Sequence, residues 1–236
     1  TDSIGTWGRI VNIYGEQGEI DKALAELTEY ESFHGKYYPR MNILLQNFNT
    51  KVRFALMTMD QQLVDNTLTE IGQYDGARGE LFRCLLPFYH SIYDVPRDGL
   101  REDFLACEDN LKTMGPMMAA YNEMTALLLE ENYAAAADMV DAKEAQGLKL
   151  ADPVTYARIN RKAGRLDKAR EFLDAELANV PKSPLLHLEL ARVQQATGDT
   201  AGARQSLAIV EEAYVNADED FLPATRAREL LAALTE

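Results

Sequence analysis

Apolar side chains recur at steps of three and four residues along most of the chain, which is the period of a half-buried helix. Leu166, Ala169, Leu173 and Leu177 form one such stripe. No strand is predicted, and short gaps rich in Gly, Pro or charged residues separate the stripes. The pattern predicts an all-α chain of about six helical hairpins and a C-terminal capping helix. The hairpins are expected at 3–33, 38–74, 77–113, 116–146, 152–179 and 184–214, and the cap at 219–235.

Residues 150–217 contain the same pattern twice, with a period of 34 residues. Gly164 and Gly198 are one period apart, and so are Ala169 and Ala203. Glycine at the end of a helix adopts the left-handed conformation at little cost, so each of these glycines is expected to close a first helix. A fixed period of this size predicts stacked helical hairpins.

These positions resemble the tetratricopeptide repeat. The two copies at 150–183 and 184–217 carry its turn Gly and its small and leucine positions, and segment 118–149 fits more loosely, with Asn132 in place of the turn Gly. The resemblance implies a single domain over 1–236, folded as a right-handed α-α superhelix that binds a protein or peptide in its concave groove. The N-terminal hairpin supplies the aromatic half of the pattern with Trp7, Ile10, Val11, Tyr14, Gly18, Ala23 and Leu27.

The charge of the chain argues against two classes of partner. The net charge is −14, of which residues 1–149 contribute −11 and residues 150–236 contribute −3. Nucleic acid and anionic membrane surfaces repel such a chain. No apolar run approaches the ~20 residues of a membrane span. We expect a cytoplasmic protein, and a periplasmic or membrane-tethered location stays open because the chain starts with Thr1 rather than Met.

One basic cluster interrupts the acidic chain, with six Arg or Lys residues and one Asp between positions 158 and 170. In the tetratricopeptide family the first helix of each pair lines the groove, so the resemblance places part of this cluster there. Grouped guanidinium groups can hold a carboxylate or phosphate through paired hydrogen bonds. The alternative is that these side chains pair with acidic neighbours such as Glu189. The predicted groove residues are Asn12, Asn122, Arg158, Arg161, Lys162, Arg192 and Gln195.

One group of the family grips the C-terminal carboxylate of a peptide with Lys and Asn side chains. Asn12 stands at one of these positions, and Gly8 replaces the Lys. The expected partner is therefore a protein or peptide with an acidic or C-terminal carboxylate segment, and homo-oligomerisation is a further option.

No catalytic or cofactor motif is present. The chain has no phosphate-binding glycine loop and no nucleophile elbow, and His34, His90 and His187 lack the spacing of metal ligands. We expect surface or interhelical histidines, no metal, no cofactor and no enzyme activity.

Cys84 and Cys107 are the two cysteines of the chain, and they lie about equally far from the turn at 94–98. Antiparallel helices would bring them to the same height. Packed helix axes stand ~8–10 Å apart, whereas a disulfide needs Cα atoms near ~5.5 Å. This comparison favours two reduced, buried thiols over a disulfide.

Aromatic residues offer a further groove-floor hypothesis, although aromatic residues at helical spacing more often pack in a core. The residues concerned are Tyr37, Tyr38, Phe88, Tyr89, Tyr93 and Tyr121.

The sequence therefore favours a non-catalytic protein- or peptide-binding scaffold. The alternative is a sensory or regulatory ligand-binding module of a larger, membrane-anchored protein. An unrecognised enzyme and a structural assembly protein are further options, which a pocket with perturbed carboxylates or an exposed apolar face would favour.

Overall fold

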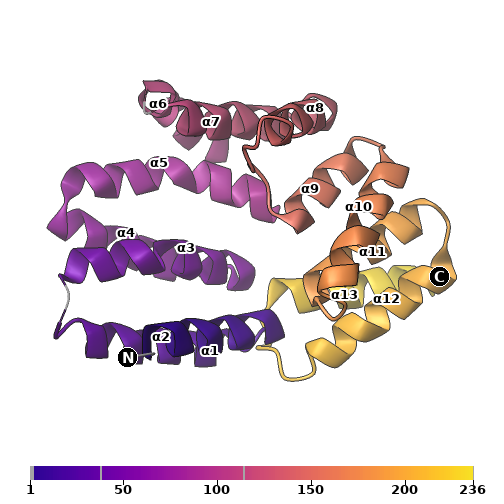
Figure 1. The fold of residues 1–236 in the computed structure, drawn as a ribbon, viewed down its shortest axis with the longest axis horizontal. Coiled ribbons are helices and arrows are strands. Elements are labelled where there is room, and N and C mark those ends of the chain that lie inside the picture. The colour runs from indigo at the N-terminus through magenta and orange to yellow at the C-terminus, as the bar shows by residue number, and fades with distance from the viewer. Residues whose placement is uncertain (1–2, 38, 114, 236) are drawn as a thin grey trace. The chain divides into compact units, whose positions relative to one another are not determined.

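The computed structural model describes residues 3–37, 39–113 and 115–235. These ranges hold thirteen α-helices and no strand, so the all-α prediction is confirmed (Figure 1). Helices that are neighbours in the chain pack together in pairs. Tyr38, one of the predicted groove-floor residues, lies outside the described ranges.

The helices follow one another with short connections. Their bounds are α1 Ser3–Gln17, α2 Ile20–His34, α3 Arg40–Thr58, α4 Gln61–Tyr74, α5 Gly76–Tyr93, α6 Leu100–Thr113, α7 Pro116–Leu129, α8 Tyr133–Glu144, α9 Pro153–Lys162, α10 Leu166–Asn179, α11 Pro184–Ala196, α12 Thr200–Ala213 and α13 Leu222–Ala233.

The chain divides into two compact units. The first contains Thr1–Arg83 and Glu211–Arg226, and the second contains Cys84–Val210 and Ala227–Glu236. The boundaries fall inside α5, α12 and α13.

In the first unit, α1 pairs with α2 and α3 pairs with α4, while α2 also packs against α3. Apolar residues at steps of three and four along α3 are part of the core of this unit. Leu44, Phe48, Val52 and Ala55 from α3 are each no more than 1% exposed. Phe48 also packs against Phe82, with ring centroids 4.1 Å apart.

The turn between α1 and α2 packs against residues 214–221, which the sequence did not indicate. The amide of Asp218 donates to the carbonyl of Gly18 at 2.9 Å, and the Asp218 carboxylate accepts from the amide of Asp21 at 2.9 Å. A Cβ on Gly18 would lie 2.6 Å from the ring of Phe221. Gly18 is therefore required both for this close approach and for its φ of +75°.

The core of the second unit is built in two layers that share α9. Tyr156 and Ile159 of α9 join one layer with residues of α7 and α8. Ala157 of the same helix joins the other with residues of α10 and α11. Phe88, Tyr89, Tyr93 and Tyr121 pack against the first layer, so the core-packing alternative holds for these four aromatic residues.

The two clean repeats end their first helices with the same turn. Gly164 and Gly198 have φ values of +76° and +79°. The amide that follows each glycine bonds to the carbonyl five residues back at 2.8 Å, which is the Schellman arrangement. The predicted left-handed glycine turns are confirmed.

The turn between α7 and α8 differs from its predicted form. Glu131, with φ of +54°, takes the left-handed position. Asn132 instead caps α8, because its side chain accepts a hydrogen bond from the amide of Ala135 at 3.3 Å. The prediction that Asn132 replaces the turn glycine is therefore wrong by one residue.

Cys84 and Cys107 form a disulfide bond, with Cα atoms 5.3 Å apart. The expectation of two free thiols was wrong because it compared a distance between helix axes with a distance between Cα atoms. Each Cα lies ~2.3 Å from its own axis, so facing residues of packed helices approach to well under the ~8–10 Å that separates the axes.

Candidate functional site

Helix α9 carries three of the predicted groove residues, and its start is well defined. The Asp152 side chain accepts hydrogen bonds from the amides of Val154 and Thr155, and Pro153 occupies the first helical position. Helix α11 also begins with a proline, Pro184. The two helices pack against each other, which brings the predicted basic residues of both onto one surface.

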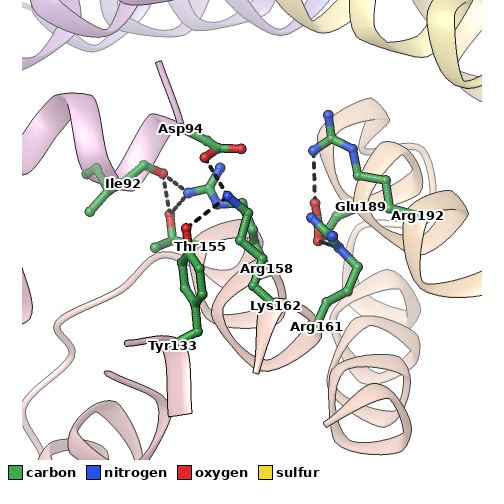
Figure 2. Close-up of polar contacts among 9 residues, drawn as sticks. All are labelled: Ile92, Asp94, Tyr133, Thr155, Arg158, Arg161, Lys162, Glu189 and Arg192. Atoms are coloured by element: carbon green, nitrogen blue, oxygen red, sulfur yellow. Dashed lines mark hydrogen bonds and ion pairs between the residues drawn. The ribbon is translucent and has the colours of Figure 1, made fainter. Parts of the chain in front are cut away.

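The centre of this surface is Glu189 of α11, whose side chain is 1% exposed. It accepts from Nε of Arg161 at 2.6 Å through one oxygen and from Nη1 of Arg192 at 3.1 Å through the other. Figure 2 shows the two guanidinium groups meeting at this carboxylate. Here the alternative weighed from the sequence holds, because both arginines pair with Glu189.

Arg158 is buried, with 7% of its surface exposed. Its guanidinium group donates to the carbonyl of Ile92 at the end of α5 and to Oγ1 of Thr155. In the described part of the chain, no carboxylate forms an ion pair with Arg158. A buried cation of this kind depends on the negative ends of peptide dipoles, as at a helix C-terminus.

Lys162 lies beside Arg158 in Figure 2. Its Nζ lies 2.7 Å from a carboxylate oxygen of Asp94 and 3.2 Å from the hydroxyl of Tyr133. The same ammonium group stands 4.9 Å from the centroid of the Tyr133 ring, within range of a cation–π contact.

Two further members of the basic cluster, Arg165 and Lys168, face α8 and are neutralised there, whereas Arg170 lies 3.9 Å from Asp174 and 3.8 Å from Asp199. Arg165 pairs with Asp138 at 2.6 Å and approaches Asp141 at 3.5 Å, and Lys168 also pairs with Asp141. Burial raises the pKa of Asp141. The hydrogen bonds from Lys168 and Tyr156, and the charges of Lys168 and Arg165, outweigh that effect, so the pKa lies below its ordinary value.

The basic surface on α9 and α11 keeps an excess of positive charge. Arg158, Arg161, Lys162 and Arg192 are four cations, and Glu189 and Asp94 are the two carboxylates bound among them, which leaves a formal charge of +2. The side chains of Arg161, Lys162 and Arg192 are 19%, 26% and 20% exposed, so a ligand can reach them. We call this set the basic surface below.

The other predicted groove residues are not all brought to the basic surface. Gln195 is exposed on α11, three residues beyond Arg192. Asn122 is buried in α7 at 3% exposure, and its Oδ1 has no hydrogen-bond partner in the described ranges. Asn12 lies in the first unit, where its Oδ1 accepts from Arg53 at 3.4 Å.

The histidines lie inside the fold. His34, His90 and His187 are 4%, 3% and 8% exposed. Burial lowers the pKa of His90, the hydrogen bond to the Val95 carbonyl partly opposes this, and the charge of Arg97 lowers it further. Within the described ranges, no three His, Cys, Asp or Glu side chains gather as a metal site would need.

None of the helices in the described ranges combines the length and apolar character needed to cross a membrane.

Sequence reasoning missed two contributors to the basic surface, Asp94 and Tyr133. Both lie in other hairpins, 68 and 29 residues from Lys162. Of the acidic residues at the basic surface, Glu189 alone could be predicted from the sequence. It stands three residues before Arg192 on the same helix, at a spacing that favours an ion pair.

Comparison with protein-family models, curated proteins and solved structures found no match to this chain.

Proposed function

We propose that this protein is a non-catalytic binding scaffold of the tetratricopeptide type, and that its basic surface captures an anionic segment of a protein partner. In this proposal the successive hairpins of the second unit stack as a right-handed superhelix. The first helices of two successive hairpins, α9 and α11, then present the ligand-binding face.

The observation that carries the proposal is a formal charge of +2 on four neighbouring basic side chains, three of which pair with two carboxylates, in a chain of net charge −14. Glu189 holds Arg161 and Arg192 in fixed positions, which lowers the entropy that a ligand must remove on binding. Each guanidinium group keeps further N–H donors, because Arg has five and these contacts use few of them. Carboxylates are the natural ligands of such donors.

The proposal can be tested with fluorescein-labelled hexaglutamate, measured by fluorescence anisotropy. Binding should be saturable and should weaken as salt rises, because exposed charge pairs are screened. Labelled hexaglutamine, which has the same length and no side-chain charge, should not bind. Failure of hexaglutamate to bind saturably at low salt would overturn the proposal.

Gln195 offers a substitution that disturbs no ion pair. Its exposed side chain makes no hydrogen bond in the described ranges. Gln195→Lys should tighten hexaglutamate binding about threefold, and Gln195→Glu should weaken it by a similar factor, since a nearby charge at the surface is worth below about 1 kcal/mol.

Lys182 supplies the matched control, because it is exposed in the same unit and lies outside the basic surface. Lys182→Gln lowers the net charge by one, as Gln195→Glu does, and should change hexaglutamate affinity less than the Gln195 variants do. An equal loss from Lys182→Gln and Gln195→Glu would mean that net charge, and not the basic surface, determines binding.

A further inference from the structure

The first unit contains a pocket that plays no part in the proposed function. Its cavity volume is about 150 Å³, and residues of α1, α2 and α3 form its walls. Trp7, Val11, Leu27 and Tyr30 supply apolar and aromatic surface. The remaining lining residues are Gly8, Asn12, Gln46, Asn47 and Thr50. The lining side chains among the described residues are all uncharged, in contrast to the basic surface.

Three of the described pocket residues carry side-chain amides, and hydrogen bonds fix the orientation of two of them, Asn12 and Asn47. Asn12 Oδ1 accepts from Arg53 at 3.4 Å, and Gln46 Oε1 accepts from the Tyr30 hydroxyl at 3.2 Å. Asn47 donates its Nδ2 to a carboxylate oxygen of Glu31 at 3.0 Å. Arg53 can only donate and the Glu31 carboxylate can only accept, so these bonds leave an N–H₂ donor on Asn12 and an oxygen acceptor on Asn47. The Tyr30 hydroxyl can do either, so Gln46 can offer a ligand a donor or an acceptor.

The orientation of Asn47 is well supported. Asn47 is 6% exposed, and its partner Glu31 is also 6% exposed. The same Glu31 oxygen lies 2.7 Å from Nζ of Lys51, so the carboxylate remains an acceptor and the Asn47 amide cannot turn without losing its bond. The Asn47 carbonyl oxygen is therefore available to accept a hydrogen bond from a ligand.

The size of the pocket limits what can enter. A cavity of about 150 Å³ accommodates one benzene-sized ring. Trp7 packs against Tyr30 and Phe33, with ring centroids 5.9 and 5.3 Å away, so contacts with two other rings hold its ring in place. Aromatic walls favour an aromatic guest in tilted or edge-to-face contact.

Gly8 keeps the pocket open on the α1 side. A Cβ at this position would meet no atom within 4 Å, so the space beside Gly8 is empty of protein. Gly8 sits inside α1 without a positive φ, where glycine costs ~1 kcal/mol relative to alanine. Glycine at this position does not stabilise the helix, but its missing side chain leaves the pocket space unfilled.

We propose that this pocket binds a phenolic ring, with the ring against Trp7 and Tyr30 and the hydroxyl among the amides. A phenol both donates and accepts, which matches the donor on Asn12 and the acceptor on Asn47. A tyrosine side chain of a partner and a free phenol share this chemistry. The site is in the first unit and is independent of the basic surface, so either proposal can fail alone.

Trp7 makes the test direct, because it is the one tryptophan in the sequence and it lines the pocket. Titration with 4-methylphenol, followed by tryptophan emission, should give a saturable change. Toluene, which has the same ring and no hydroxyl, should bind about tenfold more weakly, since it leaves the amides without partners. Equal binding of toluene, or a linear response to 4-methylphenol, would overturn the proposal.

Filling the pocket from two walls provides the structural control. Gly8→Leu on α1 and Thr50→Leu on α3 should each reduce 4-methylphenol affinity at least tenfold, and Gly8→Leu should leave the thermal midpoint unchanged or raise it. Gly72→Leu is the matched variant, because Gly72 lies in α4 of the same unit, has the same open space at its Cβ and does not line the pocket. Normal binding in both filled variants would contradict the assignment.

The two sources of the ring are separated by a third probe, N-acetyl-tyrosinamide. If it binds at least as tightly as 4-methylphenol, the pocket accepts a tyrosine side chain with its backbone attached. If 4-methylphenol alone binds, the pocket accepts a free phenol. Failure of both to bind would remove the site.

Discussion

The α9–α10 and α11–α12 hairpins share a turn and a core pattern, yet their polar side chains have different partners. Arg158 and Arg192 stand one 34-residue period apart. Arg158 is buried against the Ile92 carbonyl, whereas Arg192 is bound to Glu189 on its own helix. Asn160 donates to its own helix at the Tyr156 carbonyl, while its counterpart Gln194 accepts from Ser206 on α12.

These two hairpins show which structural features recur with the 34-residue period and which do not. The turns and the small core residues depend on contacts inside one hairpin, so they recur with the period. Arg158 and Glu189 instead have partners in other hairpins. Arg158 of α9 donates to the Ile92 carbonyl at the end of α5, and Glu189 of α11 accepts from Arg161 of α9. Four substitutions or treatments test this contrast, in order of expected effect.

The largest effect is expected from Glu189→Gln. This change leaves Arg161 and Arg192 close together without the carboxylate that they share. Removing one partner of a buried ion pair costs about 3–5 kcal/mol, and urea unfolding should show a loss of that size. Asp94→Asn, at a carboxylate that is 35% exposed, should cost less than about 1 kcal/mol. Equal losses in the free energy of unfolding would mean that the buried Glu189 carboxylate stabilises the fold no more than the partly exposed Asp94 does.

The second effect concerns the disulfide between Cys84 and Cys107, which joins α5 to α6. The end of α5 is also where Arg158 binds. The bridge closes a loop with a sequence separation of 23, so its removal should cost about 3 kcal/mol. Urea unfolding of Cys84→Ser/Cys107→Ser measures this loss. Thiol titration of the denatured, unreduced protein should find no free cysteine, and two free thiols would contradict the assignment.

The third effect separates the two equivalent arginines. Arg158→Met should cost about 2 kcal/mol, because it removes a buried, charge-assisted hydrogen bond to a carbonyl. Arg192→Met should cost about 1 kcal/mol, since Arg161 remains on Glu189. Urea unfolding compares the two variants directly. A smaller loss from Arg158→Met than from Arg192→Met would reverse the contrast.

The fourth effect is a pH dependence next to the Arg158 contact. The pKa of His90 is lowered in the folded protein, mainly by burial, so the unfolded chain takes up a proton first as pH falls below about 6.5. This contribution to stability is present above pH ~6.5 and is lost below it, by at most ~1.4 kcal/mol per pH unit. His90→Gln should flatten this part of the stability–pH curve. An unchanged slope would contradict the assignment.

The sequence was sufficient to predict the features that depend on contacts within a single hairpin. The helices, the glycine turns at Gly164 and Gly198 and the core leucines follow from a 3.6-residue period and from glycine's access to positive φ. The contact of Gly18 with Phe221 could not be predicted, since no local pattern links residues 203 positions apart. The pocket left a weak signal, because Asn47 interrupts the apolar stripe between Leu44 and Phe48.

The central functional claim is that the basic surface captures an anionic segment, and hydrogen exchange with and without hexaglutamate tests it most directly. We expect slower exchange in α9 and α11, with α8 unchanged because its carboxylates already neutralise Arg165 and Lys168. Protection confined to other helices, or none at peptide concentrations that saturate the anisotropy signal, would contradict it.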